Sequence, residues 1–95
     1  MTGMDTGQLT VQGRLNIETV PELFDKGLLY LSEGDLRVDF SQVKTVDSAA
    51  ISMLLGWKRA AQRYKRSVQV IGWPADLLSL AKLYGVDGML PLDED

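Results

Sequence analysis

Residues 38–51, with the sequence VDFSQVKTVDSAAI, predict a strand, a loop and the start of a helix in that order. Val38 and Phe40 alternate with polar neighbours, as in a strand with one buried face. An amphipathic helix then begins at the pair Asp47 and Ser48. The first turn of a helix leaves backbone N–H groups without partners and carries a partial positive charge. A hydroxyl at this position can cap the helix or present a phosphate to it, so we expect function at this junction.

The rest of the chain alternates predicted strands with predicted helices. The strands are expected at residues 9–15, 36–40 and 67–71, the helices at about residues 20–32, 48–65 and 74–84, and a short extended end at residues 89–90. The first helix has a predicted capping box from Thr19 to Glu22, and the last is expected to end at Gly85. This alternation predicts an α/β domain with a mixed or mostly parallel sheet of about four strands and about three helices, largely on one face.

A chain of 95 residues, of which 45% are apolar, suits one folded domain. We place this domain at residues 9–91, after a flexible N-terminal segment at residues 1–8 and before an acidic tail at residues 92–95. The first residues lack the basic and apolar regions of a signal peptide, and no apolar run approaches the roughly 20 residues that cross a bilayer. We therefore expect a cytoplasmic protein without direct membrane insertion.

The composition also limits the chemistry. The chain has no His and no Cys, which removes zinc and haem ligation, thiol chemistry and His-assisted nucleophiles. Asp39 and Asp47 remain as a possible carboxylate pair, but two carboxylates without a His or a phosphate-binding loop are a weak signal. The net charge of −3 argues against nucleic acid as the main partner. We expect no catalytic, cofactor-binding or metal-binding residues.

The predicted helix at residues 48–65 has two faces. At about 100° per residue, its core face consists of Ala50, Leu54, Trp57, Ala61 and Tyr64. Its opposite side carries Ser48, Ser52, Leu55, Arg59, Gln62 and Arg66. Leu55 is the apolar member of this polar side, and the sequence leaves open whether it binds a partner or packs at the flank of the helix.

Half of the ten basic residues fall within nine positions at the end of this helix. They are Lys58, Arg59, Arg63, Lys65 and Arg66. These side chains can complement the negative end of the helix dipole and keep this face soluble, or they can form a patch for an acidic partner. The sequence leaves both interpretations open.

Residues 39–55, with the sequence DFSQVKTVDSAAISMLL, resemble the STAS domain that anti-sigma factor antagonists share with the tails of anion transporters. The resemblance covers about residues 9–91 and includes the order of strands and helices. In the antagonists, the corresponding Ser is the site of regulatory phosphorylation, a role that would fall on Ser48. Ala50 and Ile51 stand where the antagonists usually have Gly and Leu.

Residues 80–86, with the sequence LAKLYGV, look like the C-terminal part of MlaB-type proteins, the small STAS subunits of the bacterial Mla phospholipid-transport ABC complex. This resemblance implies a non-enzymatic accessory subunit that binds the cytoplasmic ATPase of a membrane complex with a permease and supports outer-membrane lipid asymmetry. The protein would then be peripheral to the inner membrane through its partner. The implied contact residues are Ser48, Ser52, Leu55 and Arg59, with Asp47 and Asp39 in supporting positions.

The alternative function uses the same junction. In an anti-sigma factor antagonist, a kinase would phosphorylate Ser48 and so control binding to an anti-sigma factor. The helix dipole favours a phosphate at this position, whereas the neighbouring Asp47 opposes it by charge repulsion. A shallow site for a small molecule is a third alternative.

Overall fold

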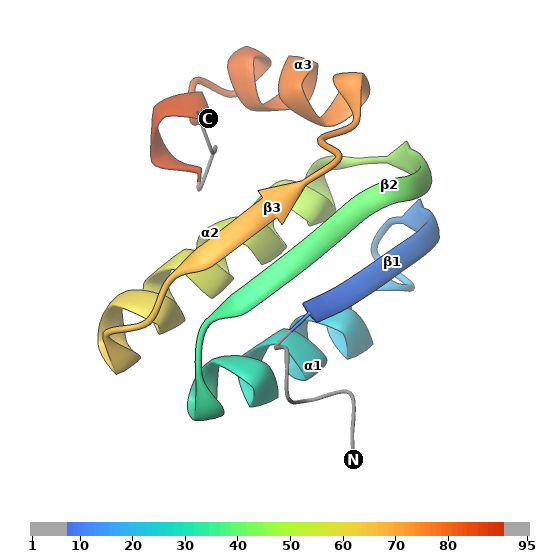
Figure 1. Cartoon of the computed structure of the whole chain (residues 1–95). Coiled ribbons are helices and arrows are strands. Elements are labelled where there is room, and N and C mark those ends of the chain that lie inside the picture. The colour runs from blue at the N-terminus through green and yellow to red at the C-terminus, as the bar shows by residue number, and fades with distance from the viewer. Residues whose placement is uncertain (1–7, 91–95) are drawn as a thin grey trace.

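The computed structural model describes residues 8–90 as a sheet with its two longer helices on one face (Figure 1). The elements follow in the order β1 (Gln8–Leu15), α1 (Val20–Glu33), β2 (Leu36–Val46), α2 (Ser48–Tyr64), β3 (Val68–Ile71), α3 (Ala75–Leu83) and the 3-10 helix η2 (Asp87–Met89). The three strands are parallel, in the order β1-β2-β3. The α/β class is confirmed, with three strands over residues 8–90 against about four in the prediction.

The ends of the chain were predicted to be a flexible N-terminal segment and an acidic tail. Residues 1–7 and 92–95 lie outside the described residues, and Gln8 is the first residue of β1. Met89 was expected to be extended, but it ends the 3-10 helix η2. Leu90 is extended and only 5% exposed, so the last described residue is part of the core.

β2 is longer than predicted, because it continues beyond Phe40 to Val46 instead of giving way to a loop. It stays paired with β1 through two shifts of register, and each shift sets one more residue of β2 than of β1 between paired positions. These are β-bulges, which bend a strand and disturb the alternation of its side chains. Ser41 and Gln42 are both exposed as a result, and the period-2 pattern of a strand is lost there. The prediction of a loop at residues 41–46 was therefore wrong.

The core lies between the sheet and the helices α1 and α2, which run side by side behind the strands in Figure 1. The buried residues of α2 are Ala50, Ile51, Met53, Leu54, Trp57 and Ala61. Tyr64 was predicted to belong to this face but is 47% exposed. Every residue from Gln62 to the end of α2 is exposed, so the last turn extends beyond the core.

Trp57 joins α2 to α1. Its side chain is completely buried, and its indole Nε1 donates a hydrogen bond of 3.0 Å to the backbone carbonyl of Phe24. Gly27 lies against the ring, and a Cβ at Gly27 would overlap the indole. Gly56 of α2 makes a similar approach to Phe24, because a Cβ there would be 2.7 Å from the Phe24 ring. The two helices are thus in close contact at two glycines.

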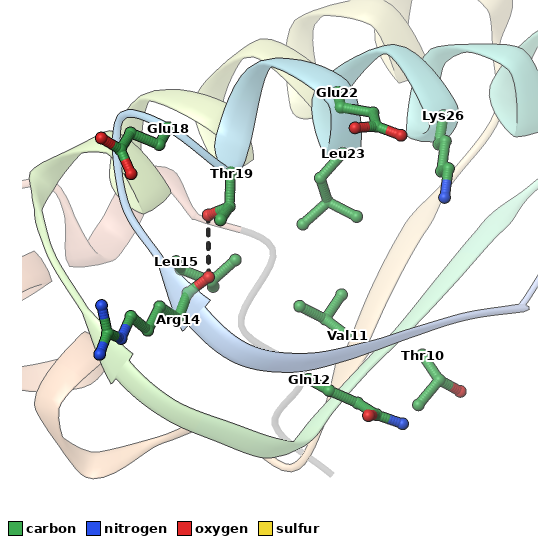
Figure 2. Close-up of a pocket in the computed structure, with 10 residues that line it drawn as sticks. All are labelled: Thr10, Val11, Gln12, Arg14, Leu15, Glu18, Thr19, Glu22, Leu23 and Lys26. Atoms are coloured by element: carbon green, nitrogen blue, oxygen red, sulfur yellow. Dashed lines mark hydrogen bonds between the residues drawn. The ribbon is translucent and has the colours of Figure 1, made fainter.

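The observed helix ends agree only in part with those predicted from the sequence. The predicted capping box at Thr19 does not form, because the Thr19 hydroxyl donates to the carbonyl of Arg14 at the end of β1, over 2.8 Å (Figure 2). The Asn16 side chain accepts hydrogen bonds from the backbone N–H groups of Glu18 and Thr19 instead. Polar side chains of the turn therefore fix the entry into α1.

The predicted end of α3 is confirmed. Gly85 has a positive φ of 70°, its N–H donates to the carbonyl of Lys82 over 3.0 Å, and the N–H of Val86 donates to the carbonyl of Ala81 over 2.9 Å. These two bonds form a Schellman motif, with Val86 packed against the core as its apolar member.

We predict that Gly27→Ala lowers the free energy of unfolding by about 1 to 3 kcal/mol, because the added methyl group overpacks the contact with Trp57. Thermal denaturation of the purified protein measures this change. Gly88→Ala is the matched control, since nothing lies within 4 Å of a Cβ at Gly88. Equal melting temperatures for the two variants would show that the helices do not require a glycine at position 27.

Candidate partner-binding surface on α2

The start of α2 is capped by Asp47. This residue has an extended backbone, and its carboxylate accepts a hydrogen bond of 2.8 Å from the N–H of Ala49. Its own N–H donates to the carbonyl of Leu15 over 3.1 Å, which ties the junction to the end of β1. Ser48 is the first helical residue, and its exposed hydroxyl makes no hydrogen bond to any residue between 8 and 90. The carboxylate therefore caps the helix, and the Ser48 hydroxyl faces solvent.

A hollow of about 480 Å³ opens between the starts of α1 and α2. One wall is apolar and the other carries two hydroxyls, and the lining residues are Ile17, Val20, Pro21, Asp47, Ser48, Ala49 and Ser52. Ile17 is 77% exposed, the largest exposed fraction among the large apolar side chains of residues 8–90. Ile17 was not among the predicted site residues, although an isoleucine within the polar turn from Asn16 to Thr19 was a visible signal.

A second hollow of about 290 Å³ lies further along α2, against η2. Its lining residues are Leu55, Lys58, Arg59, Gln62, Gly88 and Met89. Leu55 is half-buried and packs against the core, so it lies at the flank of the helix as one alternative expected. The Lys58 ammonium donates to the carbonyl of Met89 over 2.8 Å, which attaches η2 to α2.

The four predicted contact residues follow one another along one side of α2. Ser48 and Ser52 line the first hollow, and Leu55 and Arg59 line the second. They are spaced by about one turn, so they form a continuous strip, which we call the α2 strip. Exposed apolar side chains flank this strip at both ends, Ile17 at the start and Met89, which is 53% exposed, further along.

Asp39 does not join this surface. It lies between the buried Val38 and Phe40 of β2, so its side chain points to the face of the sheet away from α2. The N–H of Ser41 donates to Asp39 Oδ1 over 2.8 Å, and this bond, together with one from the Ser41 hydroxyl, lowers the pKa of Asp39 below its usual value. Asp39 and Asp47 each bind the N–H two residues ahead and share no partner within the described chain.

A third hollow, of about 360 Å³, lies between β1 and α1 (Figure 2). Figure 2 shows Val11, Leu15 and Leu23 toward the interior, with Glu22 and Lys26 on the helix above them. None of the residues predicted for function lines this hollow. Over residues 8–90, no three His, Cys, Asp or Glu side chains are grouped to hold a metal ion, and no helix has the length and apolarity needed to cross a membrane.

The sequence model of the family described as "Mlab, STAS domain" matches residues 3–91, a range that includes the whole described structure. A comparison with curated proteins gave no match. STAS domains are in general binding or regulatory domains, so this match is consistent with an accessory or regulatory role that depends on protein–protein contacts. The chain belongs to the MlaB-type family of STAS-domain proteins.

Proposed function

We propose that this protein is a non-enzymatic accessory subunit that binds the cytoplasmic ATPase of an ABC transporter for phospholipid trafficking. Its membership of the MlaB-type family supports the proposal, because the resemblance of residues 80–86 to MlaB-type subunits implies this accessory role. The observation that carries it is the α2 strip with Ile17 exposed beside it. The protein would reach the inner membrane only through the complex of ATPase and permease.

The chemistry of the α2 strip suits a protein partner. Ser48 and Ser52 are short and exposed, so the backbone of a partner can approach α2 closely at this point. Ile17 provides apolar area that is in contact with water in the isolated domain, and its burial in a complex is favourable. The only carboxylate in this hollow, Asp47, already caps α2. With that carboxylate engaged, the residues of the hollow offer no free general base beside a serine hydroxyl, as catalysis by a serine nucleophile would need.

An anti-sigma factor antagonist with a phosphorylation switch is the second candidate. One observation favours it: the Ser48 hydroxyl is exposed at the start of a helix and free of hydrogen bonds to residues 8–90. A phosphate there would meet the Asp47 carboxylate, which already accepts from the N–H of Ala49. Incubation with the protein kinase from the same genome, followed by mass spectrometry, tests this candidate; phosphate on Ser48 would support it.

We predict that Ile17→Glu weakens binding of the purified ATPase at least about tenfold, because it places a charge in an apolar contact. The melting temperature of the isolated protein should stay close to that of the wild type, since Ile17 is 77% exposed. Isothermal titration calorimetry and thermal denaturation measure the two quantities. Leu29→Glu is the matched control, because Leu29 is 63% exposed on α1 but does not line the hollow. Equal affinities for the two variants would contradict a contact at Ile17.

Capping and binding can be separated at neighbouring residues. We predict that Asp47→Ala lowers the free energy of unfolding by about 0.5 to 2 kcal/mol, because α2 loses its N-cap. Ser48→Ala should leave the stability unchanged and weaken association with the ATPase several-fold. Denaturant titration and co-purification provide the measurements. A loss of stability in Ser48→Ala without a change in binding would reduce Ser48 to a structural residue.

A further inference from the structure

The cations at the end of α2 are exposed and unpaired within the described chain. The Lys58 ammonium attaches η2, but the side chains of Arg59, Arg63, Lys65 and Arg66 make no hydrogen bond or ion pair with any residue between 8 and 90. We call these four residues the basic end. It carries four positive charges on a chain whose net charge is −3, so the charge of the molecule is strongly asymmetric.

The helix dipole accounts for only part of the basic end. Its effect is confined to the last turn of a helix, where α2 has only Arg63. Lys65 is the C-cap and Arg66 follows it, so both also lie near the negative end of the dipole. Arg59 lies five residues before the helix ends at Tyr64, outside this range. Lys65 has a left-handed backbone with φ of 59°, a conformation that favours glycine. A positive charge therefore stands where glycine would be the more stable choice.

The basic end continues the α2 strip. Arg59 belongs to both, and Arg63 follows it one turn later on the same side of the helix. The rise of about 1.5 Å per residue puts Arg63 about 16 Å along the axis from Ser52 in the first hollow. One side of α2 thus offers an apolar hollow at its start and exposed cations at its end.

We propose that the partner bound along the α2 strip places acidic side chains against Arg59, Arg63 and Arg66 and an apolar side chain in the hollow beside Ile17. This inference rests on the proposed function and adds the chemistry and the direction of docking. Charge complementarity carries it, because the unpaired cations lie in line with the apolar contact. The net charge of −3 disfavours nucleic acid and anionic membranes as the occupant, since the rest of the molecule would be repelled by them.

The test is calorimetric titration of the purified ATPase with wild-type protein and with the Arg59→Glu/Arg63→Glu variant. The wild-type affinity should fall about tenfold between about 50 mM and about 300 mM NaCl, as salt screens the charge pairs. The variant should bind at least about tenfold more weakly at the lower salt concentration and show little salt dependence. Lys26→Glu/Lys82→Glu is the matched control, because it makes the same change of net charge at exposed positions on α1 and α3 and should bind like the wild type.

Three results would overturn the inference. Equal, salt-independent binding by wild type and variant would overturn it and leave the proposed function intact. Equal weakening by the control pair would attribute the effect to net charge alone. The third result is a lower melting temperature of the isolated protein at low salt, both after charge reversal and after deletion of residues 92–95. It would show that the cations pair with these acidic residues and not with a partner.

If the wild-type protein binds no ATPase at either salt concentration, the proposed function fails. A titration with a poly-glutamate peptide, followed by NMR at low salt, then decides the inference separately. Chemical-shift changes confined to the amides of residues 59–66 would support an acidic ligand at the basic end. Their absence would overturn it.

Discussion

The contact between Trp57 and Gly27 sets the distance between α1 and α2, on which the core and the candidate surface both depend. A buried indole N–H needs an acceptor, and the carbonyl of Phe24 provides it only if α1 comes close enough. The absence of a side chain at Gly27 allows this approach. The hollow beside Ser48 lies between the starts of the same two helices, so its width follows from the same contact.

The junction between β2 and α2 determines which polar groups remain available. The bulges carry β2 to Val46, so that Asp47 directly follows the strand and its N–H reaches the carbonyl of Leu15. The carboxylate of Asp47 then caps α2 through Ala49. Because one residue meets both backbone requirements, the next residue, Ser48, is free to present its hydroxyl to a partner. Under the proposed function, Asp47 serves the structure and the adjacent Ser48 serves binding.

Local signals in the sequence were sufficient to place the helices along the chain and insufficient to predict the length of β2. The end of α3 could be predicted because Gly85 adopts a conformation that few other residues tolerate. The continuation of β2 could not, because the bulges expose both Ser41 and Gln42 and remove the alternation on which strand prediction depends. The prediction of a capping box at Thr19 was also wrong, because the Thr19 hydroxyl bonds to the end of the preceding strand, a contact that exists only in the folded domain.

The helical wheel could place Ser48, Ser52, Leu55 and Arg59 on one side of α2, because their relation is fixed within a single helix. It could not find Ile17, which comes beside Ser48 only when α1 packs against α2. Leu55 is half-buried against the core, so the most exposed apolar group of the candidate surface belongs to the turn before α1. The surface is therefore a property of the folded domain, and α2 as an isolated helix would lack the wall that holds Ile17.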